Sequence, residues 1–276
     1  MDDNSAKAVE RALTILEALA ERDNGMTNAE ISRRLEIPKS SASYILRALE
    51  RRGYLRRDGE TNKYRLGLKA LSLSRGALDG LDIRRVALPE LRRLMERSHL
   101  TAHLAVLDHG EAVYVEKVEA PGFVKMNTWV GRHMPIHCTS VGKALVAWLP
   151  ESEIKALLKE NGMRRRTSKT IVVSARYLQE LERVREQGYA VDDEENNYGV
   201  RCVAAPIFDS LNRVVASVGV SGTTTQNDVD HLPKVAELVK EAARKVSRQV
   251  GGQTTGATRI EDRGSRIEDR ESPYVR

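Results

Sequence analysis

The sequence has few of the residues that mark secreted, membrane or disulfide-stabilised proteins. Only two of its 276 residues are cysteines, Cys138 and Cys202, and only 4% are aromatic. Two cysteines are too few for a disulfide framework, and these lack the CxxC spacing of many metal and redox sites. No apolar run approaches the ~18–20 residues that cross a bilayer, and the N-terminus lacks the apolar stretch of a secretion signal. These absences predict a cytoplasmic protein with reduced thiols and no membrane partner.

The composition is that of a globular protein, and one segment of the chain is rich in basic residues. Hydrophobic residues make up 41% and charged residues 30% of the sequence, and its length suits one large domain or two ordinary ones. From Lys39 to Arg65 there are eight basic and three acidic residues, a net charge of +5, whereas the whole chain carries +6. Charge concentrated in this way predicts a polyanionic partner.

The segment before and within this basic region has the pattern of short helices. Val9, Leu13, Leu16 and Ala20 recur at helical spacing and predict an amphipathic helix over residues 5–21. Thr27 and Glu30, three residues apart, match a capping box at the start of a second helix. Pro38 marks a turn, because a proline forces the residue before it out of helical geometry.

A third helix, followed by a hairpin, predicts a winged helix-turn-helix domain over residues 1–66. Ala42, Ile45, Leu46 and Leu49 lie on one face of the helix and are expected to pack inward. Residues 54–66 follow as strand, turn and strand. Hydroxyls, a tyrosine and arginines on the outer face can reach the base edges and phosphates of double-stranded DNA. The expected DNA-binding residues are Lys39, Ser40, Ser41, Ser43, Tyr44, Arg47, Arg51, Arg56, Arg57, Lys63 and Arg65.

The remainder of the chain predicts a connector and an α+β domain. Residues 67–81 continue as a connector helix, in which Leu68, Leu71 and Leu73 are available to pack against a partner chain. Residues 82–250 form the second domain, whose alternation of strand pairs with helices predicts a mainly antiparallel sheet. The hairpins are expected at 100–119 and 202–222, and the helices at 140–149, 151–160, 174–187 and 228–249. The tail, 251–276, is too poor in apolar residues to pack, so disorder is expected there.

Several segments together resemble IclR-family bacterial transcriptional regulators. RALTILEALA, MTNAEISRRLEIPKSSASYILRALERRGYL and KYRLGLKALSLS are similar to the family's N-terminal domain. MPIHCTSVGKALVAWLP and GYAVDDEENNYGVRCVAAPIFD, followed by VVASVGVSG, are similar to its effector-domain signatures. The resemblance spans residues 5–249. It implies a GAF-like effector-binding domain, a dimeric or tetrameric regulator and a small-molecule effector, often a carboxylate. We expect a repressor in preference to an activator, with no enzymatic activity and no cofactor.

The resemblance also implies an effector pocket, which carries over to Ser140, Val141, Asp192, Cys202 and Ser221. The loop before residue 140 leads into a helix whose free N–H groups would favour an anion, although Thr139 or Ser140 could equally be an ordinary cap. Gly219 stands where some relatives place a pocket serine, which argues against a small polar ligand or leaves room for a larger one. Asp192 would repel a carboxylate unless it is protonated or bonded to a ligand hydroxyl, which favours a hydroxy- or keto-acid.

Other chemistry finds little support in the sequence. His137 and Ala144 break the GxxxxGK[ST] pattern of a phosphate loop. No spacing joins either cysteine to a histidine base, and Pro135 interrupts the helix that would bring His133 and His137 to one metal. An enzyme with a fused DNA-binding domain and a DNA-binding protein without a ligand remain as alternatives.

Overall fold

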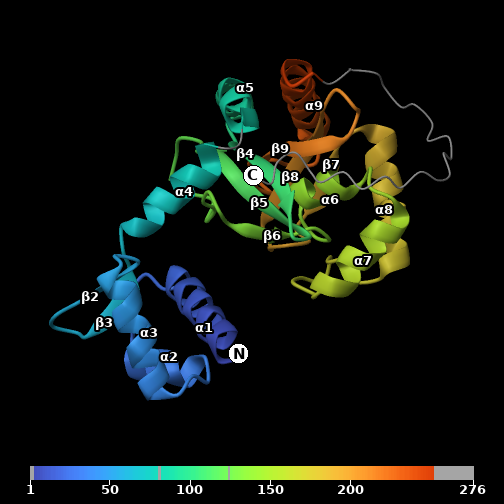
Figure 1. The fold of residues 1–276 in the computed structure, drawn as a ribbon. Coiled ribbons are helices and arrows are strands. Elements are labelled where there is room, and N and C mark those ends of the chain that lie inside the picture. Colours follow the sequence, from blue (N-terminus) through green and yellow to red (C-terminus); the bar gives the residue numbers. More distant parts are fainter. Residues whose placement is uncertain (1–2, 80–81, 124, 252–276) are drawn as a thin grey trace. The chain divides into compact units, whose positions relative to one another are not determined.

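A computed structural model of the chain describes residues 3–79, 82–123 and 125–251. These residues divide into two compact units on either side of residue 80. The first unit holds α1–α4 and β1–β3, and the second holds α5–α9 and β4–β9 (Figure 1). In the described part of the chain, no helix is long and apolar enough to span a membrane. From residue 252 on, the tail for which disorder was predicted lies outside the described residues.

The first unit is a winged helix-turn-helix, as the sequence predicts. Its elements are α1 (Asp3–Ala20), β1 (Met26–Thr27), α2 (Asn28–Arg34), α3 (Lys39–Arg51), β2 (Leu55–Arg57), β3 (Lys63–Leu66) and α4 (Lys69–Asp79). The strands form an antiparallel sheet in the order β1-β3-β2. The β2–β3 hairpin extends away from the helices as the wing (Figure 1). Strand β1 was not predicted, because two residues are too short to show an alternation.

The predicted capping box fixes the start of α2. The Thr27 hydroxyl accepts a hydrogen bond from the Glu30 N–H (3.3 Å), and the Thr27 N–H donates to the Glu30 carboxylate (2.7 Å). The Asn28 side chain donates to the carbonyl of Lys39 (3.4 Å), which joins the start of α2 to the start of α3. Pro38 occupies the N-cap position of α3, so the turn between the two helices lies where the sequence predicted it.

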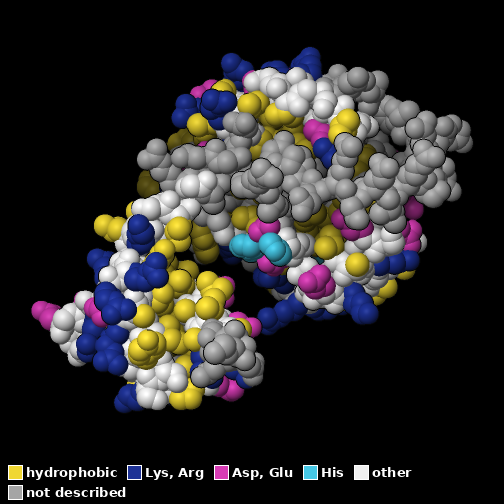
Figure 2. Space-filling model, viewed as in Figure 1, with side chains coloured by type: hydrophobic (Ala, Val, Ile, Leu, Met, Phe, Trp, Pro, Cys, Tyr) yellow, Lys and Arg dark blue, Asp and Glu magenta, His cyan; other side chains and the backbone are white. Residues whose placement is uncertain are grey.

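The apolar stripe that predicted α1 is not its buried face. Ile15 and Leu19 are buried in the core of the unit, whereas Val9 is 60% and Leu13 is 54% exposed. Because α1 carries apolar residues on two sides, spacing alone could not tell which side packs inward. Hydrophobic side chains along α1 are visible on the surface (Figure 2).

The second unit is an α+β domain around a six-stranded sheet. Its elements are α5 (Asp82–Ser98), β4 (Thr101–Asp108), β5 (Glu111–Val118), β6 (His133–Pro135), α6 (Ser140–Val146), α7 (Glu151–Asn161), α8 (Ser174–Gln187), β7 (Ala190–Asp193), β8 (Val200–Phe208), β9 (Val214–Thr223) and α9 (Leu232–Gln249). The order β6-β5-β4-β9-β8-β7 pairs every strand antiparallel to its neighbours. Helices α5 and α9 cover one face, and α6 packs on the other with α7 and α8 beyond it (Figure 1). The predicted mainly antiparallel sheet is confirmed.

Candidate functional site

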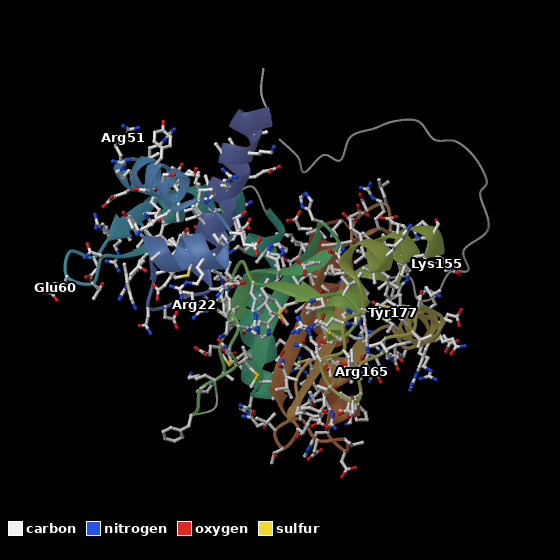
Figure 3. The ribbon with its side chains drawn as sticks, turned by 90° about the horizontal axis from the view of Figure 1, so that it is seen from below. Arg22, Arg51, Glu60, Lys155, Arg165 and Tyr177 are labelled. Carbon is white, nitrogen blue, oxygen red and sulfur yellow. The ribbon has the colours of Figure 1, made fainter. Side chains whose placement is uncertain are left out.

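The outer face of α3 presents polar and basic side chains above a buried apolar face. Ala42 and Leu46 are fully buried, while Tyr44 is 73% exposed and Arg47 and Arg51 are exposed. Arg51 projects from the outer side of the unit (Figure 3). Among the other residues predicted on this helix, Lys39 and Ser40 are exposed, and Ser41 and Ser43 are half-buried. This face is therefore free to contact the edges of bases in a groove.

The wing divides its basic residues between two faces. Arg56 pairs with Arg65, and Arg57 pairs with Tyr64, in the β2–β3 register. Because successive side chains of a strand point to opposite faces, Arg57 faces away from Arg56 and Arg65. The Arg57 guanidinium donates to the Asn62 side chain (2.6 Å) and lies 5.7 Å from the centre of the Tyr64 ring. Arg57 therefore holds the hairpin together and has less freedom to bind a phosphate than sequence alone suggested.

The tip of the wing is ordered by its own acidic residue. The Asp58 carboxylate accepts hydrogen bonds from the N–H groups of Thr61 (2.8 Å) and Glu60 (3.1 Å). These hydrogen bonds lower the pKa of Asp58. Glu60 lies at the end of the loop (Figure 3). Lys and Arg side chains gather on the side of the unit that carries α3 and the hairpin (Figure 2), which gives this side the charge that a nucleic acid backbone requires.

A row of paired residues crosses the inner face of the six-stranded sheet in the second unit. Asp192 pairs with Cys202, Cys202 with Ser221, and Ser221 with Thr101. Directly opposed residues of antiparallel strands point to the same face, so these four side chains lie side by side. The Ser217 hydroxyl, on the same face, donates to the carbonyl of Val141 (3.1 Å) and so holds the start of α6 over the sheet. The structure thus brings together the strand residues predicted for the effector pocket and the helix that carries the other two.

Asp192 is the buried acid of this row. Its Oδ1 accepts hydrogen bonds from the N–H groups of Glu195 (2.8 Å) and Asn196 (3.2 Å). Within the described part of the chain, no partner is found for Oδ2. Burial, followed by the neighbouring charge of Glu195, raises the pKa of Asp192 to about 7. Near neutral pH the carboxyl group is therefore present in both its protonated and its ionised form.

This raised pKa gives the protein a measurable dependence of stability on pH. A carboxyl group with a raised folded-state pKa contributes stability that is present below its unfolded pKa, 3.8, and is lost as the pH rises through about 7. Between pH 5 and 7 we therefore expect the native protein to lose stability relative to Asp192→Asn, by up to about 1.4 kcal/mol per pH unit. Urea unfolding of both proteins across this range measures the difference, and parallel curves would contradict it.

The start of α6 is capped in the ordinary way. The Thr139 hydroxyl accepts a hydrogen bond from the Gly142 N–H (3.2 Å), so this N–H is already occupied. Ser140 and Val141 are 2% and 4% exposed. A Cβ atom at Gly142 would lie 2.5 Å from the Cα of Ile136, so only glycine lets the helix pack this closely. These contacts favour the helix cap that the sequence left open as the alternative to an anion site.

Gly219 does not provide extra room for a ligand, and that expectation was wrong. A Cβ atom on this residue would lie 2.8 Å from the Ala204 Cβ and 2.8 Å from the Val203 carbonyl oxygen. The space that a serine would need is filled by the neighbouring strand. Glycine is required here by the close approach of β8 to β9.

Sequence reasoning missed a buried lysine behind the row. Lys143 of α6 is fully buried, and its ammonium group contacts Glu195 Oε1 (2.5 Å), the carbonyl of Val191 (2.8 Å) and Glu180 Oε1 (3.4 Å). It therefore joins α6 to β7 and to the turn that bonds Asp192. Burial raises the pKa of Glu195. The available signal was a single lysine within the otherwise uncharged helix SVGKALV.

Among the described residues, Cys138, His133 and His137 are engaged in other contacts, and the cysteines and histidines do not gather into a metal-ligating cluster. Burial raises the pKa of Cys138 to about 12 and raises that of Cys202 as well, so both thiols stay protonated near pH 7 and are poor nucleophiles. The His137 ring bonds the carbonyl of Arg164 (3.1 Å), and the His133 ring bonds Glu111 (3.2 Å). No group of three potential metal ligands among His, Cys, Asp and Glu occurs in the described ranges.

Comparisons with known proteins cover both units. Residues 8–59 match the family model of the IclR helix-turn-helix domain, and residues 75–248 match that of the bacterial transcriptional regulator IclR C-terminal domain. The chain is 36% identical over 245 residues to the HTH-type transcriptional regulator XynR of Escherichia coli K12, covering 89% of this chain and 97% of that protein. It is 31% identical over 246 residues to the HTH-type transcriptional repressor AllR of the same strain, covering 89% and 91%.

A solved structure agrees with these sequence matches. The crystal structure of an IclR transcriptional regulator from Alicyclobacillus acidocaldarius has a TM-score of 0.77 and 30% sequence identity, and the match covers 89% of this chain and 99% of that one. The similarity therefore includes both the winged helix-turn-helix unit and the unit that contains the buried row.

Proposed function

Because the chain belongs to the IclR family of bacterial transcriptional regulators, we propose that it is a homo-oligomeric repressor whose binding to operator DNA is controlled by a small carboxylate. Membership of this family identifies the chain as a DNA-binding regulator. The name of AllR supports repression. A regulator of this kind acts on double-stranded DNA in the bacterial cytoplasm. The proposal is carried by the exposed polar face of α3, which lies beside a basic wing in a unit that has its own hydrophobic core.

On this proposal α3 enters the major groove and the wing lies along the backbone. Tyr44, Arg47 and Arg51 are exposed on the outer face of α3 and can reach base edges or phosphates. Arg56 and Arg65, on one face of the wing, neutralise phosphates, while Arg57 supports the hairpin. In a dimer, two such units would bind half-sites ~34 Å apart or a multiple of that distance.

Replacing Arg47 with alanine is expected to weaken specific DNA binding by roughly 1–3 kcal/mol, the usual contribution of one good base contact. Arg47 is exposed, and its described hydrogen bond is a long one from Nε to the carbonyl of Ser43 (3.3 Å), so its loss should leave the fold intact. Duplexes selected from a random pool and titrated at fixed salt measure the affinity. Arg183→Ala, which removes a 74% exposed arginine from α8, is the matched control. Equal affinities of the two variants would reject this docking.

Exposed apolar residues of the first unit support self-association. Leu68, immediately before α4, is 80% exposed, and Leu71 and Leu73 within α4 are 65% and 58% exposed. Val9 and Leu13 of α1 are exposed in the same unit. Adjacent exposed apolar residues are typical of interaction surfaces, and we propose that a second copy of the chain covers them. A dimer formed in this way presents two α3 helices to one palindromic operator.

The effector pocket of the proposal lies on the inner face of the GAF-like second unit. Asp192, Cys202 and Ser221 form its floor, and Ser140 and Val141 at the start of α6 cover it. The acid available to the ligand has an unpaired oxygen, which suits a hydroxy- or keto-acid. Neither rival function gains support, because both thiols are protonated and because Asp192 keeps one oxygen that can accept a hydrogen bond from a ligand.

A further inference from the structure

A second basic segment lies in the second unit, in the loop between α7 and α8 and the start of α8. Residues 162–179 have a net charge of +5, because they include no acidic side chain and five basic ones, Arg164, Arg165, Arg166, Lys169 and Arg176. The segment from Lys39 to Arg65 in the first unit has the same net charge spread over more residues. Since the two segments together exceed the +6 of the whole chain, the rest of the chain is acidic on balance. Positive charge segregated in this way indicates a polyanionic partner here as well.

Three consecutive arginines carry the unpaired charge of this segment. Arg164, Arg165 and Arg166 are all exposed. In the described part of the chain, the guanidinium groups of Arg164 and Arg166 have no hydrogen-bond or ion-pair partner, and Arg165 makes one long hydrogen bond, to the carbonyl of Ser168 (3.3 Å). Lys169, by contrast, is bonded to two carboxylates. Like charges held side by side repel one another, so an anion that contacts the three arginines removes this repulsion.

The loop beneath these side chains is held firmly to its unit. The Thr167 and Thr170 hydroxyls are buried and donate to the carbonyls of Glu194 and Glu195, at 2.7 Å each. The N–H groups of residues 166–169 are bonded to side-chain oxygens of Thr167, Thr170 and Tyr198. A loop that is ordered in the free protein loses little conformational entropy when its side chains bind a partner. Because its N–H groups are already used, the loop offers an anion its guanidinium groups and not a backbone cradle.

DNA is the polyanion that fits this arrangement. The chain is a DNA-binding regulator of the IclR family, so a continuous array of phosphates is present whenever it acts. Arginine side chains supply many of the contacts that proteins make to DNA phosphates, and such contacts need no helix that reads bases. A small phosphorylated molecule usually binds where free backbone N–H groups converge, and this loop has none to offer at residues 166–169.

We propose that Arg164, Arg165 and Arg166 form a second DNA contact, on the second unit, which binds phosphates outside the half-site held by the first unit. Such a contact adds affinity irrespective of base sequence. It also steepens the fall of affinity with salt, by about 0.9 in the log–log slope for each neutralised phosphate. The contact is separate from α3 and the wing and requires no effector, so it goes beyond the proposed function.

The test replaces these residues together, as Arg164→Gln, Arg165→Gln and Arg166→Gln, in the full-length protein. Operator duplexes selected from a random pool are titrated with and without about two helical turns of flanking DNA, between about 50 and 200 mM salt. On the flanked duplex the loss of three contacts is expected to lower the slope by roughly 2.7, so the native affinity falls about fortyfold more than that of the variant across this range. On the bare operator the two proteins are expected to have similar slopes, because the flanking phosphates are absent.

A second triple variant separates a local contact from a general effect of charge. Arg92 of α5 and Arg244 and Arg248 of α9 are exposed and form no hydrogen bond or ion pair among the described residues. Replacing them with glutamine removes the same charge from the same unit, and the slope is expected to stay within about one of the native value. A control variant that loses as much slope as the loop variant overturns the proposal.

Two further results would also overturn it. One is a loop variant that keeps the native slope on flanked DNA. The other is a native protein whose affinity and slope stay the same when the flanks are removed, a comparison that needs no variant to fold. Arg47→Ala, measured on the bare operator, judges the docking of α3 separately, so the two proposals can fail independently.

Discussion

Replacing Lys143 with methionine is expected to lower the free energy of unfolding by about 3–5 kcal/mol, the usual cost of breaking a buried ion pair from one side. The ammonium group has no exposure to solvent and contacts Glu195, Glu180 and the carbonyl of Val191. Methionine preserves most of the volume but leaves Glu195 buried without its cation. One oxygen of that carboxylate, Oε2, already lacks a partner among the described residues. Chemical denaturation monitored by circular dichroism measures the loss.

Two comparisons separate this cost from a general effect of losing a lysine. Lys155 of α7 is 56% exposed and pairs with Glu151 (2.5 Å), so Lys155→Met should cost less than about 1 kcal/mol. Lys155 lies on the outer side of its unit (Figure 3). Replacing both Lys143 and Glu195 with apolar residues should restore part of the stability, because no unpaired charge then remains. If Lys143→Met is no more damaging than Lys155→Met, the buried pair does not have the role assigned to it.

Replacing Asp192 with alanine is expected to abolish the response to effector while DNA binding in the absence of effector is retained. Asp192 lies in the second unit, whereas α3 and the wing belong to the first, which has its own core. Alanine removes Oδ2, the acceptor available to a ligand, from the position opposite Cys202 in the β7–β8 pair. DNA titrations with and without the acid that binds the native protein measure the response.

Asp192→Asn provides the control for folding. Asparagine retains an oxygen that can accept the N–H groups of Glu195 and Asn196, whereas alanine leaves these buried groups unpaired at a cost of roughly 1–3 kcal/mol. We expect Asp192→Asn to be stable, to bind DNA and to respond weakly or not at all. Loss of DNA binding in this variant would indicate general misfolding, and a full response in either variant would remove Asp192 from the pocket.

Local patterns predicted most of the fold. The capping box at Thr27, the turn at Pro38 and the inward stripe of Ala42, Ile45 and Leu46 are all present, because each depends on neighbours in the sequence. The buried side of α1 could not be predicted, since its orientation depends on the residues it packs against. The short strands β1, β6 and β7 were missed because two to four residues are too few to show an alternation.

The arrangement of the proposed pocket residues was harder to predict from the sequence than the fold. Family resemblance pointed to Asp192 and Cys202, and the strand register then placed them on adjacent strands. The pairing of β4 with β9, which places Thr101 beside Ser221, joins segments far apart in the sequence and was marked by no local pattern. The expectation for Gly219 failed because a missing side chain was taken as free space, whereas the backbone of β8 fills it.

The row from Asp192 to Thr101 also bears on which parts of the proposed pocket can move. Strands β8, β9 and β4 are hydrogen-bonded on both sides, so the backbone under Cys202, Ser221 and Thr101 cannot shift without disturbing its neighbours, whereas Asp192 lies on the edge strand β7. The start of α6 is joined to the sheet by far fewer bonds, among them the one from Ser217 to Val141 and those of Lys143. A molecule bound between the two would therefore meet a stiffer support in the sheet than in the start of α6.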